Sequence, residues 1–175
     1  MFDSLNFFKK KKTSQLGVEL DHLSNLYLNP LSSQKIKKAV SFADQAHQGQ
    51  FRKSGEPFII HPINVGMILA SLKMDADTII AGLLHDVVED CDISLAEVRK
   101  EFGKNVSKLV DGMTKLLQLD EKLKDQSQAE YFQKMALATA EDVRVVIIKL
   151  ADRLHTLKQL NICLGKNKLK KAKKH

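Results

Sequence analysis

The chain has 175 residues, of which 43% are hydrophobic and 28% are charged. That composition is typical of a folded domain with one sizeable core, and it argues against intrinsic disorder. The longest apolar run is broken by Arg144 and Lys149, so nothing approaches the roughly 20 apolar residues of a membrane span. Two cysteines without zinc-finger spacing, and the lack of a secretory pattern, predict a cytoplasmic protein.

The formal net charge of +7 comes from the two ends of the chain. Four lysines occupy positions 9–12 and six lie in the last ten residues. Without these ten, the chain has 18 basic and 21 acidic residues, a net charge of −3. Lysine-rich ends can bind nucleic acid or anionic lipid. Aromatic residues are not interleaved with these lysines, so we favour solvated ends and expect neither a nucleic-acid nor a membrane partner.

Helical periodicity dominates the chain, and the sequence predicts an all-α helical bundle. We expect an N-terminal extension with a short helix over 1–30, a main domain over 31–160 and a lysine-rich C-terminal tail over 161–175. Ser94 and Glu97 have capping-box spacing, and Gly103 is placed to end the helix that they start. PFII (57–60) is the one candidate strand, and the charged stretch 119–127 is expected to be a loop. The remaining predicted helices cover 37–47, 62–72, 77–90, NVSKLVDGMTKLL (105–117), SQAEYFQKMALATA (127–140) and 141–160.

One of these helices contains an unusual mixture of residues. GLLHDVVEDC (82–91) places His85, Asp86, Glu89 and Asp90 among four aliphatic residues. On a continuous α-helix the four ionisable side chains fall within an arc of about 140°. An amphipathic helix with a solvated polar face explains this pattern. A row of metal ligands and catalytic carboxylates on a buried helix explains it equally well.

Two further residues have the chemistry of ligands. His61 precedes Pro62, which biases it away from α geometry and places it immediately before a helix. Asp152 follows a strongly apolar stretch, where a carboxylate is costly to bury unless it is paired or bound to metal. Each also has a simpler explanation. His61 is then a residue at a helix start with one hydrogen bond, and Asp152 is half of a surface pair with Arg153 or Lys149.

Taken together, two imidazoles and two carboxylates can hold one divalent cation and leave positions open for water and substrate. Nitrogen and oxygen donors without thiolate suit Mn²⁺, Fe²⁺ or Zn²⁺ better than a structural zinc site. Glu89 and Asp90 would lie one turn beyond the ligands, where they could orient or deprotonate a water molecule. This hypothesis requires the ligands, which come from three distant segments, to touch a common atom.

Five long motifs follow one another along the chain: HQGQFRKSGEPFIIHP, AGLLHDVVED, FGKNVSKLVDGMTKL, QAEYFQKM and DVRVVIIKLADRLHTL. Together they resemble the hydrolase domain of the RelA/SpoT-homologue family, bacterial enzymes that make and destroy the alarmone (p)ppGpp. The resemblance extends from about Lys35 to Leu160 and implies an HD-superfamily helical fold with one Mn²⁺. It further implies hydrolysis of the 3′-diphosphate of guanosine tetraphosphate or pentaphosphate.

Position by position, the resemblance assigns a role to each candidate residue. Arg52, Lys53 and Ser54 match the loop that cradles the guanine nucleotide, and Arg52 also offers a planar fork for stacking or for phosphate. Glu89 and Asp90 match the acidic pair needed for hydrolysis. The implied metal ligands are His61, His85, Asp86 and Asp152, and the further implied substrate contacts are Lys149, Thr156 and Gln159.

The chain departs from the family pattern at two of these positions. The family usually has asparagine and threonine where this chain has Thr156 and Gln159, on the helix face that also carries Asp152. Thr156 keeps a hydroxyl but lacks the paired donor and acceptor of an amide, which puts selectivity for the guanosine portion in question. A related hydrolase acting on another phosphorylated nucleotide, or a non-catalytic nucleotide-binding remnant, therefore stays open. So does the choice between a stand-alone protein and part of a longer one.

Overall fold

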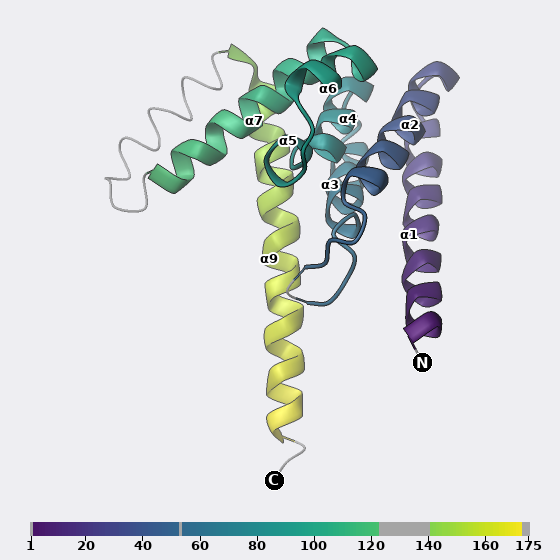
Figure 1. Ribbon diagram of the computed structural model, residues 1–175, viewed down its shortest axis with the longest axis vertical. Coiled ribbons are helices and arrows are strands. Elements are labelled where there is room, and N and C mark those ends of the chain that lie inside the picture. The colour runs from purple at the N-terminus through teal and green to yellow at the C-terminus, as the bar shows by residue number, and fades with distance from the viewer. Residues whose placement is uncertain (1, 53, 123–140, 173–175) are drawn as a thin grey trace.

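The computed structural model describes the backbone of residues 2–52, 54–122 and 141–172, and the side chains of 13–52, 54–116 and 141–160. Over these ranges the chain is a bundle of α-helices, which confirms the predicted fold class (Figure 1). The helix expected over 127–140 lies outside the described residues. The helices are α1 (Phe2–Asn25), α2 (Pro30–Ala46), α3 (Ile60–Ser71), α4 (Ala76–Leu84), α5 (Val87–Asp90), α6 (Leu95–Phe102), α7 (Lys104–Lys122) and α9 (Val143–Ala172).

Helix α4 lies at the centre of the bundle, in contact with α2, α3, α7 and α9. Its residues from Thr78 to Leu84 are all buried, so the surrounding helices enclose it on every side. At Gly82 a Cβ atom would collide with the side chain of Leu69, and glycine therefore permits the close approach of α3 to α4. Figure 1 shows the two long helices α1 and α9 flanking this pair.

The ends of several helices differ from those expected. Helix α1 has 24 residues and is longer than the short helix predicted for the N-terminal extension. Helix α7 continues to Lys122, where a loop was predicted from Leu119, because three of the four residues 119–122 (leucine, glutamate and lysine) are good helix formers. Helix α9 continues to Ala172, into the segment expected to be a tail. The capping box of Ser94 and Glu97 and the ending at Gly103 are confirmed.

The start of α3 corrects the prediction made for His61. The helix begins at Ile60, so His61 lies within its first turn and Pro62 follows at the third position. Proline is tolerated there because first-turn N–H groups have no partner inside the helix. The candidate strand at 57–60 is reduced to one isolated bridge between Phe51 and Pro57, followed by the turn that leads into α3.

The single helix predicted over 77–90 is interrupted at the residues of greatest interest. Helix α4 ends at Leu84 and the four-residue α5 begins at Val87. His85 and Asp86 form the turn between them, and Asp86 accepts backbone hydrogen bonds from Glu89 and Asp90. The break frees these residues from the arc expected of one continuous helix. No helix among the described residues combines the length and the apolar character needed to cross a bilayer.

Candidate metal and catalytic site

His85 follows the last turn of α4, and the local backbone fixes its protonation. The ring is almost fully buried, and its Nδ1 lies 2.8 Å from the carbonyl oxygen of Gly82. A carbonyl can only accept a hydrogen bond, so Nδ1 carries the proton. The Nε2 atom of the neutral ring consequently holds a lone pair, directed away from the helix.

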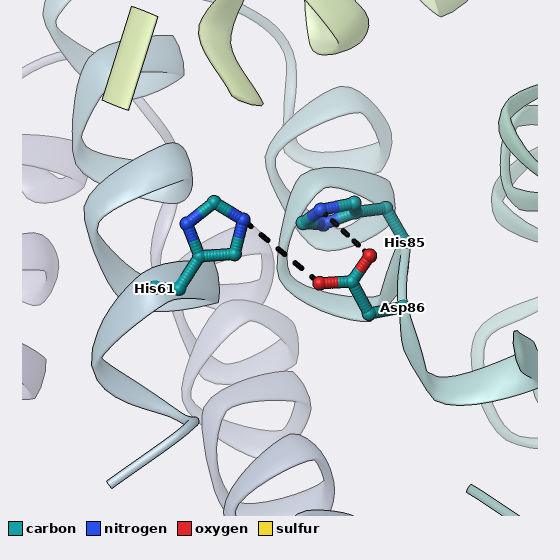
Figure 2. Close-up of side chains that lie close together, drawn as sticks. All are labelled: His61, His85 and Asp86. Atoms are coloured by element: carbon teal, nitrogen blue, oxygen red, sulfur yellow. Dashed lines mark ion pairs between the residues drawn. The ribbon is translucent and has the colours of Figure 1, made fainter. Parts of the chain in front are cut away.

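Three other side chains converge on this atom. His61 comes from α3, Asp86 from the turn after α4 and Asp152 from α9. Figure 2 shows the first two together with His85. Oδ1 of Asp86 lies 3.0 Å from Nε2 of His85, and Oδ1 of Asp152 lies 4.0 Å from the same atom. Nε2 of His61 is 3.1 Å from Oδ1 of Asp152 and 3.9 Å from Oδ2 of Asp86. The structure therefore brings together all four residues predicted as ligands.

This cluster has the donor set of a cation site. Nε2 of His85 is buried and has no hydrogen-bond partner among the described residues, although two carboxylates lie nearby. The Nε2 lone pair and the two carboxylates are all hydrogen-bond acceptors and repel one another. Their close approach is stable only when an extra proton or a cation lies among them. Mixed imidazole and carboxylate donors suit a divalent transition metal. The residues present therefore fit a bound divalent cation.

Asp152 stays ionised in this position. Burial alone would raise its pKa, but the hydrogen bond from His61 and the positive charge of Lys149 help to hold the pKa of Asp152 at about 2. Lys149 is itself buried on α9, and its Nζ lies 3.9 Å from Oδ2 of Asp152. Lys149, which was predicted as a substrate contact, thus lies beside the Asp152 carboxylate and places a positive charge at the edge of the cluster.

His155 is a component of the site that our sequence reasoning missed. Its Nδ1 lies 2.6 Å from Nδ1 of His61, and both rings are buried. Burial lowers the pKa of His155 to about 4, so the ring is neutral at pH 7. The signal was present in the sequence, because His155 follows Asp152 by three residues and therefore lies on the same face of a helix.

The acidic pair of α5 occupies a more open position than the residues of the cluster. Glu89 and Asp90 are both exposed on a helix that contacts α7. Partial burial and the neighbouring Asp86 carboxylate nevertheless raise the pKa of each above its ordinary value. A carboxylate with a raised pKa is a better proton acceptor, which is the property expected of a general base.

The loop between α2 and α3 (residues 47–59) also contributes to the site, through Arg52. Arg52 stacks its guanidinium 6.0 Å from the ring centre of Phe58, and its charge contributes to lowering the pKa of both His61 and His155. Its Nη1 is buried without a hydrogen-bond acceptor among the described residues. Such an arginine is suited to bind an anion. Ser54 is exposed in this loop, and Lys53 lies outside the described residues.

Thr156 and Gln159 are half-buried on α9, beyond Asp152. Their spacing of four and seven residues from Asp152 keeps them on the helix face that carries this carboxylate. They are therefore placed where a molecule bound beside the cluster would extend along α9.

A chain of hydrogen bonds links the loop to the acidic pair. Gln50 donates through Nε2 to the backbone carbonyl of Asp90 over 2.9 Å, and its Oε1 lies 2.8 Å from Nδ1 of His47. His47 is buried at the C-terminal end of α2, where its ring stacks on Phe58. Gln50, which the sequence did not single out, thus fixes the end of α5 to the base of the loop.

Comparison with known proteins relates this site to a family. Residues 39–175 match the family model described as HD domain. A protein of Aquifex aeolicus named guanosine-3′,5′-bis(diphosphate) 3′-pyrophosphohydrolase is 44% identical over 162 residues, 93% of this chain and 23% of the relative. The bifunctional (p)ppGpp synthase/hydrolase SpoT of Escherichia coli K12 is 44% identical over 141 residues, 81% of this chain and 20% of the relative. The chain thus spans about a fifth of the length of these relatives.

A solved structure shows the same likeness over most of its own length. That structure is of a metazoan ortholog of SpoT, which is described as hydrolysing ppGpp and playing a role in starvation responses. The two chains are 33% identical with a TM-score of 0.59, and the match covers 78% of this chain and 73% of the other. At this level of identity, the likeness extends beyond the arrangement of helices to the sequence itself.

Proposed function

The chain belongs to the HD-domain family, with the RelA/SpoT-homologue hydrolase domains as its relatives, and on that basis we propose that it hydrolyses (p)ppGpp. The reaction would remove the 3′-diphosphate of the guanosine tetraphosphate or pentaphosphate and yield GDP or GTP with pyrophosphate. One of the relatives is named for both synthesis and hydrolysis, so the name of a relative does not by itself select the reaction. The selection rests on the site.

The observation that carries the proposal is the cluster of unprotonated acceptors around Nε2 of His85. We assign His61, His85, Asp86 and Asp152 as the ligands of one divalent cation, with Mn²⁺ as the metal. When bound, such a cation lowers the pKa of a coordinated water molecule and offsets charge on a phosphoryl group. The proposed chemistry thus needs no nucleophilic side chain from the protein.

The remaining residues bind and orient the substrate and move protons. Glu89 and Asp90, whose pKa values are raised, accept or position the proton of the attacking water. Arg52 offers its buried Nη1 to a phosphate or its planar face to the base. Lys149 contributes positive charge beside Asp152, while Lys53, Ser54, Thr156 and Gln159 complete the proposed contacts with the nucleotide.

A second candidate is the same chemistry on another phosphorylated nucleotide. It is favoured by Thr156 and Gln159, which stand on the α9 face beyond Asp152 in place of the residues usual in the family. A threonine hydroxyl cannot reproduce the paired donor and acceptor of an amide. Selectivity for guanosine is therefore the feature that separates the two candidates.

One assay tests both candidates. The purified chain is incubated with Mn²⁺ and a panel of nucleotides, and released pyrophosphate and phosphate are measured. We expect pyrophosphate from ppGpp and pppGpp, and its loss in Asp86→Ala and Glu89→Ala variants that keep the helical circular-dichroism spectrum. Phosphate or pyrophosphate from a different nucleotide alone would select the second candidate. Unchanged turnover in either variant would remove both.

A further inference from the structure

The contact between His61 and His155 has a chemical consequence. Their Nδ1 atoms are 2.6 Å apart, and the rings, with centroids 4.9 Å apart, are tilted by 34°. A hydrogen bond between two nitrogens needs one proton and one lone pair. One ring must therefore donate from Nδ1 while the other accepts, and the choice determines what His61 presents at Nε2.

Two arrangements satisfy this contact. In the first, His155 donates to His61, and His61 carries its own proton at Nε2 and donates it to Asp152, 3.1 Å away. In the second, His61 donates from Nδ1 to His155 and presents a lone pair at Nε2. Only the second allows Nε2 to bind a cation, because a protonated nitrogen has no lone pair.

We propose that His155 is a positioning residue, which accepts the Nδ1 proton of His61 and so fixes its ring and tautomer for cation binding. This inference rests on the metal site of the proposed function. The change between arrangements conserves protons: His61 releases its Nε2 proton to water, the shared proton moves from His155 to His61, and His155 takes up a proton at Nε2 from water. Both rings stay neutral throughout.

The surroundings support this role. Helix α9 contacts His61 on both sides of its ring, with Asp152 at Nε2 and His155 at Nδ1, so one rigid element sets the orientation of a ligand from α3. Partners that orient metal-bound histidines typically change metal affinity by about 10- to 100-fold when removed.

Two substitutions separate hydrogen bonding from packing. His155→Leu fills a similar volume but cannot accept a proton, whereas His155→Asn retains an acceptor oxygen close to the position of Nδ1. Affinity for Mn²⁺ is measured by electron paramagnetic resonance of the free ion, with thermal melting of the metal-free chain as the check on folding. His47→Leu is the matched control, since it removes another buried, hydrogen-bonded histidine that touches none of the four ligands.

We expect His155→Leu to weaken Mn²⁺ binding by about 10- to 100-fold. His155→Asn and His47→Leu should stay within about threefold of the wild-type affinity. A direct readout is the tautomer of His61, measured by ¹⁵N NMR with Zn²⁺ as the diamagnetic probe. The wild-type chain should show the Nδ1–H form with Zn²⁺ bound.

Near wild-type affinity in His155→Leu, or equal weakening in His155→Leu and His155→Asn, would overturn the inference. An Nε2–H tautomer of His61 in the Zn²⁺-bound chain would do the same. Failure of the proposed function would give different results. A chain that binds Mn²⁺ with the expected variant pattern but releases no pyrophosphate would refute the function and leave the role of His155 intact. A wild-type chain that binds no cation would refute both.

Discussion

The four proposed ligands and the two acidic residues beside them lie in opposite environments, although Asp86 and Glu89 are only three residues apart. The proposed ligands come from α3, from the turn after α4 and from α9, and the two histidines among them are almost fully buried. Glu89 and Asp90 lie on a four-residue helix and are exposed. We call these two regions the ligand cluster and the acidic pair.

The difference follows from what each region has to do. A cation site needs fixed donors at short distances, and helices packed in a core supply them. A group that exchanges protons with water and meets a substrate needs an open side. The break at His85 and Asp86 allows both within six residues, because it ends the buried helix before the acidic pair begins. Substitutions in the two regions should therefore have separable effects on binding and on turnover.

The largest effect is expected from Asp152→Asn, within the ligand cluster. It removes one of the two negative charges that face the histidines while keeping the size of the side chain. Because a metal ion acting as a Lewis acid supplies several kcal/mol, we expect pyrophosphate release to fall by about 10³-fold, together with a loss of Mn²⁺ binding. Calorimetric titration with Mn²⁺ and a pyrophosphate assay measure the two effects.

Asp142→Asn is the control for this change. Asp142 lies just before α9 and pairs with Arg144 at 2.7 Å, so it carries the same charge without a place in the ligand cluster. Its Mn²⁺ affinity should match that of the wild-type chain. If Asp152→Asn binds Mn²⁺ as tightly as Asp142→Asn, the ligand assignment of Asp152 is wrong.

The next effect is expected from Glu89→Gln, in the acidic pair. Removal of a general acid or base lowers rates by about 10²- to 10⁴-fold, so we expect kcat to fall within that range. Mn²⁺ affinity should not change, because Glu89 is outside the ligand cluster. Glu97→Gln, at an exposed helix start on α6, should change neither quantity. Loss of Mn²⁺ binding in Glu89→Gln would erase the proposed distinction between the two regions.

A smaller effect is expected from Gln50→Leu, which breaks the link between the loop and the acidic pair. Without the donor to the carbonyl of Asp90, the end of α5 loses its tie to the loop. Small displacements of positioned groups slow catalysis, and we expect kcat to fall roughly tenfold while Mn²⁺ affinity is retained. Gln48→Leu, in the exposed turn after α2, provides the control. Equal kcat in both variants would show that the link is dispensable.

The sequence predicted the members of the ligand cluster better than their backbone setting. Imidazoles and carboxylates within apolar stretches are detectable because burying them unpaired is costly. The break after Leu84 was not detectable, because no glycine or proline marks it and the aliphatic spacing continues through Val87 and Val88.

Contacts between distant segments escaped sequence reasoning for a different reason. His155 pairs with a residue 94 positions away, and Gln50 with one 40 positions away. Periodicity identifies the face on which a residue lies, but not which residue of another helix it meets. His155 could have been assigned to the site from its spacing to Asp152, whereas its partner became visible only in the fold.

The smallest effect is expected from Asp75→Ala, which tests how firmly the ligand cluster is supported. Asp75 caps α4, the helix that leads to His85, and accepts from the backbone N–H and hydroxyl of Thr78. It also lies 3.4 Å from Nη1 of Arg144 at the start of α9. Loss of such a cap costs about 1 kcal/mol, so we expect a decrease of that size in the free energy of unfolding at pH 7.

The pH dependence of this decrease identifies its origin. Burial opposes the change, but the hydrogen bonds from Thr78 and the charge of Arg144 lower the pKa of Asp75 below its usual value. A carboxylate whose pKa is lower in the folded state stabilises the fold above its ordinary pKa of about 4, and this contribution disappears as pH falls further. The difference between wild type and Asp75→Ala, measured by urea unfolding, should therefore be constant from pH 7 to about 5 and shrink below 4. A difference that grows on acidification would mean that the ionised cap does not support α4.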